Sequence, residues 1–258
     1  LHLADLVLPL PDPHLFFLPG DGLIPGTANM PFFRKVRLMK ELKQLTADNL
    51  LQDLGAGTHF NTLDVLLACN LGFVVTSPEP TAILNAYSFI KTSLYRLFNA
   101  NLPAKHSARP LVQRFFAGRA EHTPPDEGGI QRLFASVAAL DSAAADKLRN
   151  LHAAFCPRIM VNMGKEVQEL ALGGRLRQVC TRHLQVNIEY IAFIPWDDEV
   201  RVSIMNRQLL CRYRPDSPFS KALGTVARKI VSSHFETLHA PIEDFADLKA
   251  LAEESDLA

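Results

Sequence analysis

Short apolar stretches that alternate with longer helix-forming ones limit this chain to a few folds. Residues 72–76, 158–162 and 188–194 are apolar over most of their length, and a polar residue or proline closes each of them. Runs of this kind are typical of strands that are covered on both faces, as in parallel sheets. Because helix-forming stretches separate them, the sequence predicts an α/β fold with a doubly wound, mainly parallel sheet and helices on both faces.

The remaining elements follow from periodicity and from turn residues. Two more strands are predicted, a buried one at 15–18 and another at 49–54. Helices are predicted at 32–45, 62–69, 80–98, 112–116, 130–153, 165–182, 198–205 and 220–233. Asp141 is expected to break the helix at 130–153 and to cap its second half. In the helix at 32–45, Lys35 is expected to lie on a solvated basic face. We expect one domain over residues 1–233 and an acidic helical tail over 234–258.

Composition excludes several classes of protein. Lys+Arg 27 balances Asp+Glu 27, so no large field of either sign directs the chain to nucleic acid. None of the four cysteines forms a C-x-x-C pair, which argues against a zinc ribbon and favours reduced thiols in the cytoplasm. The tail carries Glu and Asp where a membrane-targeting helix needs Lys or Arg, so we expect no direct membrane binding.

Four polar or special residues follow predicted strands directly. They are Asp53, Ser77, Asn162 and Pro195. In an open parallel sheet, ligands bind beyond the carboxyl ends of the strands. The sequence therefore predicts that these four residues meet at one rim and form a single site.

The segment after Asp53 carries the clearest chemistry. Asp53 precedes a glycine turn that contains Gly55 and Gly57. A carboxylate there can hold hydrated Mg²⁺ near a phosphate, and the glycines let the backbone approach that phosphate. The alternative is that Asp53 only hydrogen-bonds its own turn.

Two segments carry a resemblance to a known family. DLGAGTHFNTLD at 53–64 and VVTSPEPTAILNAYSFIK at 74–91 resemble the nucleotide-switch half of MinD/ParA-type P-loop ATPases, in their FlhG-like subgroup of flagellar-number regulators. The resemblance implies that ATP and Mg²⁺ are the cofactors. It also implies that Asp53 is the metal-holding catalytic residue and that Gly55 and Gly57 contact the nucleotide.

The resemblance extends downstream to the base of the nucleotide. Asn162 is similar to the family's strand-end Asn, which contacts adenine, and Pro195, Trp196 and Asp197 are similar to the segment that flanks the base. The alternatives are a capping role for Asn162 and simple strand termination for Pro195.

The chain departs from the family most clearly in its phosphate loop. No G-x-x-x-x-G-K-[ST] phosphate loop occurs in it, and we expect that loop to precede Leu1 in the parent reading frame. The chain alone is thus expected to be a poor ATPase. The family implies an ATP-dependent homodimer that contacts a regulatory protein partner in flagellar or cell-positioning control. The alternatives are a non-catalytic interaction scaffold on the same fold and a nucleotide-dependent synthetase or reductase.

Overall fold

The computed structural model describes residues 3–20, 32–117 and 129–232, so the tail predicted at 234–258 lies outside the described residues. The helices are η1 Leu3–Leu6, α1 Phe32–Leu42, α2 Phe60–Ala68, α3 Pro80–Ala100, α4 Arg109–Ala117, α5 Gly129–Ala138, α6 Ser142–Ala154, η2 Val167–Ala171, α7 Leu172–Leu184, α8 Asp198–Met205, α9 Leu210–Tyr213 and α10 Pro218–Ser232. The strands are β1 Leu8–Pro9, β2 Phe16–Phe17, β3 Phe73–Thr76, β4 Arg158–Gly164 and β5 Glu189–Pro195.

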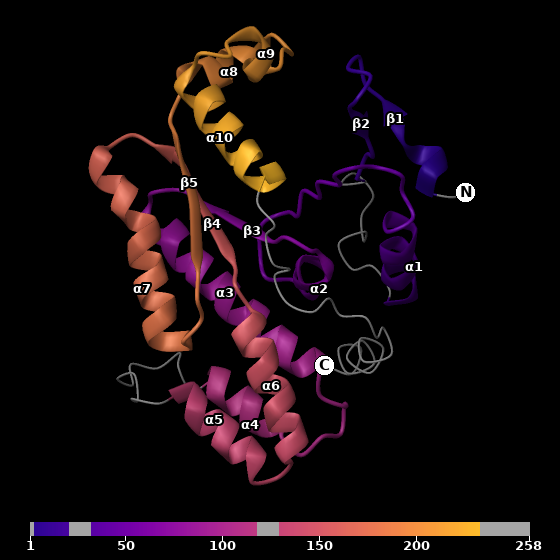
Figure 1. Cartoon of the computed structure of the whole chain (residues 1–258), viewed down its shortest axis with the longest axis vertical. Helices are drawn as coiled ribbons and strands as arrows, with labels where there is room; N and C mark the ends of the chain where they lie inside the picture. The colour runs from indigo at the N-terminus through magenta and orange to yellow at the C-terminus, as the bar shows by residue number, and fades with distance from the viewer. Residues whose placement is uncertain (1–2, 21–31, 118–128, 233–258) are drawn as a thin grey trace.

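A parallel sheet with the order β3-β4-β5 organises the molecule. The fold is therefore mixed α/β, as the alternation predicts, although the parallel sheet of the described residues has three strands. In Figure 1, α7 and α10 flank β5 on opposite sides, and α4, α5 and α6 gather at the far end of α3. α10 is fixed to the sheet by Lys229, whose Nζ donates to the carbonyl oxygen of Ile191 at 2.7 Å.

Three strand predictions are corrected. Residues 49–54 form no strand, and Leu51 is 91% exposed there. The run at 15–18 does contain β2, but β2 pairs antiparallel with β1 and its two phenylalanines are exposed, not buried. In β3, Val75 is also exposed, so that strand is not covered on both faces. A local apolar pattern reports strand propensity, whereas pairing and burial depend on neighbours that the pattern does not contain.

The helices follow the sequence more closely. Pro80 occupies the first turn of α3, where its missing N–H costs no hydrogen bond. Asp141 separates α5 from α6 as expected, and its side chain accepts a hydrogen bond from the Ala144 amide at 3.0 Å. The stretch at 165–182 begins as the short 3-10 helix η2 before α7, and α9 was not expected from the sequence.

The main core lies among the helices and extends to the sheet. Phe98 of α3 is fully buried and stands at its centre, with its ring 6.1 Å from the rings of both Phe116 and Phe134. α7 adds Leu176, and β4 adds Ile159. Because α3 to α7 all contribute to one apolar cluster, the sheet and the helical end of the molecule share a single core.

Glycine at position 173 lets α7 approach β5. A Cβ at Gly173 would lie 2.5 Å from the Tyr190 ring, whereas a Cβ at Gly174 would meet nothing within 4 Å. The Tyr190 ring of β5 therefore occupies the space that a side chain at position 173 of α7 would need. The two adjacent glycines thus form a natural pair of test and control.

We expect Gly173→Ala to lower the free energy of unfolding by about 1–3 kcal/mol, because the added methyl group overpacks the α7–β5 contact. Gly174→Ala should be neutral, or stabilising by up to about 1 kcal/mol through helix propensity. Urea denaturation followed by circular dichroism measures both. Equal effects of the two substitutions would contradict the close approach.

His152 is a partly buried histidine that joins α6 to the end of α7. Its Nε2 lies 2.9 Å from the carbonyl oxygen of Leu184, so this nitrogen carries the proton and donates. Its ring also meets the ring of Phe134 at 5.6 Å. Burial lowers the pKa of His152 below its ordinary value of 6.5. The folded protein therefore favours the neutral form of this side chain more strongly than the unfolded chain does.

The unfolded chain binds a proton at position 152 before the folded chain does, so this residue makes stability fall as the pH drops below about 6.5. His152→Gln keeps a donor for Leu184 but removes the titration. We expect the difference in unfolding free energy, wild type minus variant, to decrease between pH 7.5 and pH 5.5. All other histidines are common to both proteins and serve as the internal control. A difference that stays constant with pH would contradict the prediction.

Candidate functional site

The carboxyl ends of β3, β4 and β5 meet at one rim of the sheet. The strands are parallel, with Thr76 opposite Val161 and Gly164 opposite Pro195. Ser77, Asn162 and Pro195 therefore lie at the same rim, as their positions after apolar runs predict. The structure does not bring Asp53 there as the end of a fourth strand, because residues 49–54 form no strand.

The end of β4 is distorted at the rim. The register between β4 and β5 shifts between Val161 and Gly164, and Met163 has φ 64, in the left-handed region. The Asn162 side chain supports this turn, because its Oδ1 accepts from the Met163 amide at 2.9 Å. A left-handed methionine is uncommon, and such backbone occurs often at functional sites. Among the described residues the Nδ2 group of Asn162 makes no hydrogen bond, so its two N–H groups are available as donors.

Trp196 joins the ends of β4 and β5. Its backbone amide donates to the Gly164 carbonyl oxygen at 2.6 Å, and its indole Nε1 donates to Asp198 at 3.1 Å. The Nζ atom of Lys165 lies 4.5 Å from the centre of the indole ring, within the range of a cation–π contact. The half-exposed indole is thus held in place at its edge and has a cation over its face.

Gly164 makes this arrangement possible. A Cβ at that position would lie 1.9 Å from the Phe193 ring, so the ring fills the place of a side chain. The sequence offered one signal for this contact, a glycine two residues after the end of the strand predicted at 158–162.

Ser77 and Glu79 follow β3, and Glu79 interacts electrostatically with Lys165, which follows β4. Glu79 is exposed, and a hydrogen bond from Ser77 is the main reason that its pKa lies below the ordinary value. The positive charge of Lys165 contributes in the same direction. Lys165 therefore interacts with groups that follow β3 and β5, and we had not selected it from the sequence.

Asp197 has a structural role at the rim. Its Oδ1 accepts from the Glu199 amide at 3.0 Å, and its Oδ2 accepts from the Phe219 amide at 3.3 Å. These bonds cap the starts of α8 and α10. Burial tends to raise the pKa of this carboxyl, but these backbone hydrogen bonds and the bond from Ser217 outweigh it together, and the net pKa is lowered. A role for Asp197 in ligand binding stays a prediction.

Asp53, Gly55 and Gly57 lie in an exposed stretch before α2. Gly57 has φ 109, a backbone conformation that favours glycine, and a Cβ there would lie 3.2 Å from the His59 ring. Their proposed contacts with Mg²⁺ and nucleotide stay predictions.

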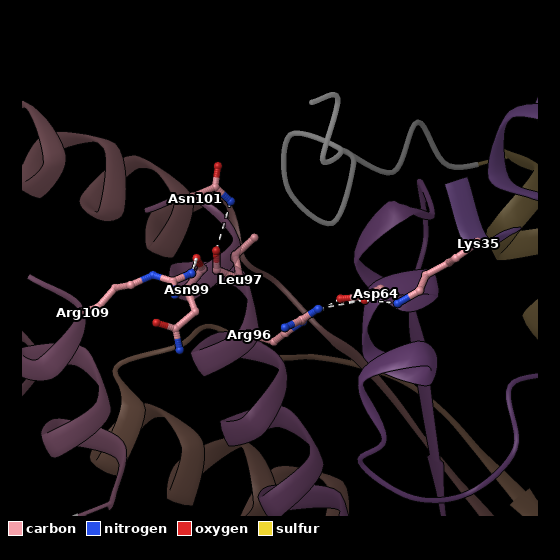
Figure 2. A network of polar contacts seen from close by, with 7 residues as sticks. All are labelled: Lys35, Asp64, Arg96, Leu97, Asn99, Asn101 and Arg109. Carbon is pink, nitrogen blue, oxygen red and sulfur yellow. Dashed lines mark hydrogen bonds and ion pairs between the residues drawn. The ribbon is translucent and has the colours of Figure 1, made fainter. Parts of the chain in front are cut away.

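A buried ion cluster fixes the helix that follows this stretch. Asp64 of α2 accepts from Lys35 of α1 at 2.6 Å and from Nε and Nη2 of Arg96 of α3 at 2.7 and 2.9 Å. Figure 2 shows the carboxylate between the two cations. The exposed fractions of the three side chains, Lys35, Asp64 and Arg96, are 10%, 2% and 6%. Lys35 thus lies in the interior, and the expected solvated position was wrong.

The sequence held a signal for this cluster. Asp64 follows Leu63 within an apolar helix, and Arg96 lies between apolar residues of α3. Charged residues are almost never fully buried unless they are paired. The Arg96 guanidinium also lies 4.4 Å from the centre of the Phe60 ring, at the first residue of α2. The position of the glycine stretch is therefore anchored to α3.

We expect Asp64→Asn to destabilise the protein by about 3–5 kcal/mol, because it leaves two buried cations without a counter-charge. Lys35→Met should cost less than half as much, since it leaves a one-to-one pair of Asp64 and Arg96. Urea denaturation of both variants measures the difference. A larger loss in Lys35→Met than in Asp64→Asn would contradict this order.

The rim has groups that fit a planar ligand with polar edges. It has an indole, an amide and an ammonium group at the ends of adjacent strands. For Mg²⁺, Asp53 would supply one carboxylate, which matches a hydrated ion that phosphate oxygens also hold. Among the described residues, no group of three His, Cys, Asp or Glu side chains is placed to hold a metal ion. A search of the same residues finds no helix that is long and apolar enough to cross a bilayer.

Comparison with known proteins gives one partial similarity. The chain is 33% identical over 94 residues to Antiactivator FleN of Pseudomonas aeruginosa, a match that covers 36% of this chain and 34% of that protein. The matched part thus spans about a third of the relative's length. No protein-family model matches the chain. The fold and the comparisons together therefore establish a mixed α/β protein with a partial similarity to an antiactivator.

Proposed function

We propose that this protein is a nucleotide-binding regulatory protein of the MinD/ParA class, and that the rim of β3, β4 and β5 receives the base of its nucleotide. The observation that carries this proposal is the meeting of Asn162, Lys165 and Trp196 at one rim. An amide can read the edge of a base, and an aromatic ring can stack on its face. The partial similarity to an antiactivator supports a regulatory role in flagellar placement or number.

The proposal extends to the family's switch. In the intact form, ATP would favour a homodimer, and hydrolysis with Asp53-held Mg²⁺ would release it. The dimer state would select a regulatory partner protein in the cytoplasm. In that scheme the backbone at Gly55 and Gly57 changes conformation when the terminal phosphate is present or lost. The ion pair between Asp64 and Arg96 would transmit this change from α2 to α3.

Trp196 is the one tryptophan of the chain, so its fluorescence reports directly on the rim. We expect adenosine and ATP to quench this emission with similar midpoints in the millimolar range, since stacking contributes only about 1–3 kcal/mol per base. Lys165→Met should change the midpoint, because a base must share the indole face with this ammonium group. Lys221→Met, which removes an exposed lysine of α10, is the matched control and should titrate like the wild type.

Two results would contradict base binding at the rim. One is an emission that adenosine leaves unchanged up to its solubility limit. The other is that adenosine quenches no more strongly than a neutral quencher does, in the wild type and in Lys165→Met alike. Either result would favour a non-catalytic scaffold that acts through protein contacts alone.

A further inference from the structure

Helices α8 and α9 lie at one end of the molecule (Figure 1). This segment exposes large apolar side chains. We call residues 201–214 the α8–α9 surface. Ile204 and Met205 are 70% and 74% exposed, and Leu209 is also exposed. Within this surface only Ser203 and Leu210 are buried. Several large apolar side chains exposed within one short segment are typical of an interaction site.

The α8–α9 surface also carries positive charge. Residues 201–214 contain no Asp or Glu, and their basic residues are Arg201, Arg207, Arg212 and Arg214. Arg212 pairs with Asp12 of the β1–β2 turn, and Arg214 lies 3.6 Å from Glu199. Within the described part of the chain, Arg201 and Arg207 form no ion pair. The surface therefore suits an occupant that is both apolar and acidic.

The chain itself contains a segment of that chemistry. Residues 233–258 hold seven acidic residues and a single lysine, and they include apolar Ile242, Phe245, Leu248 and Leu251. The segment follows α10, whose start is joined to the start of α8 by the carboxylate of Asp197. A 15-residue helix is about 22 Å long, whereas 26 extended residues can span about 85 Å. The segment is therefore long enough to reach back to the surface.

We propose that the acidic C-terminal segment, residues 234–258, binds the α8–α9 surface of its own chain. Its carboxylates pair with Arg201 and Arg207, and its apolar residues cover Ile204 and Met205. Because the two are joined covalently, the effective concentration is in the millimolar range, so weak contacts suffice. Binding shields the surface until a partner with a stronger acidic and apolar segment displaces it. This inference goes beyond the proposed nucleotide site and does not depend on it.

A native thiol reports on this contact. Cys211 is exposed and lies in α9, whereas Cys180 is buried and Cys69 and Cys156 are partly buried. Burial raises the pKa of Cys69 and Cys156 and raises that of Cys180 to about 12, so these thiols react slowly. The rate at which uncharged N-ethylmaleimide modifies Cys211 in the full-length chain therefore measures how often the surface is open.

We expect this rate to rise at least about threefold when Asp244, Asp247, Glu253 and Glu254 are replaced by Asn and Gln. That factor corresponds to a bound form that outnumbers the free form by two to one. The control replaces exposed Asp146 and Glu166 in the same way and should leave the rate unchanged. Equal rates in the wild type and the tail variant would overturn the proposal.

Charge removal on the α8–α9 surface tests the same contact from the other side. The variant R201Q/R207Q removes the two cations that would pair with the segment and leaves Cys211 in place. We expect a faster reaction of Cys211, since the segment is released. A slower reaction in R201Q/R207Q would overturn the proposal.

Crosslinking identifies the occupant. In Ala246→Cys, a short bismaleimide should join the introduced thiol to Cys211 within one chain, at a yield that does not depend on protein concentration. Lys147→Cys on the exposed face of α6 is the control and should not crosslink to Cys211. Two results would overturn the proposal: crosslinks that join two chains only, or protection of Cys211 only when vesicles of phosphatidylcholine and phosphatidylglycerol are added.

Discussion

The carboxylate of Asp64 holds the first half of the chain together. It joins α1, α2 and α3 through one lysine and one arginine, all three almost fully buried. Taking charges out of water costs several kcal/mol per ion, and such an arrangement is stable only when every charge finds a partner. The geometry of α2, and with it the exposed glycine stretch that precedes this helix, therefore depends on a single acidic residue.

The rim depends on a different constraint, namely two glycines whose missing side chains leave room for aromatic rings. Phe193 lies where Gly164 would carry a Cβ, and Tyr190 does the same at Gly173. Two rings of β5 thus fix β4 and α7 by shape. The backbone amide of Trp196 also donates a hydrogen bond to Gly164, and the ammonium group of Lys165 lies over the indole ring. Close packing of this kind helps to give the polar side chains of the rim defined positions.

Sequence reasoning predicted the elements whose determinants are local. The runs that became β4 and β5, the Asp141 cap and the proline at the start of α3 each depend on a few adjacent residues. It failed at residues 49–54, because a strand needs a partner, and at Lys35, because its counter-ion Asp64 lies 29 residues away. Lys165 was missed for the same reason, since Trp196 reaches it only through the fold.

Asp197 gives the molecule a mechanical property that neither the rim nor the α8–α9 surface has alone. One carboxylate caps two helices, two residues after a strand ends. A shift of this strand end would therefore carry the starts of α8 and α10 along together. If binding at the rim shifts this strand end, the rim and the α8–α9 surface are coupled, and such coupling acts equally in both directions. Whatever binds beside Trp196 would then change the affinity of the α8–α9 surface for its occupant, and that occupant would tune the rim in return.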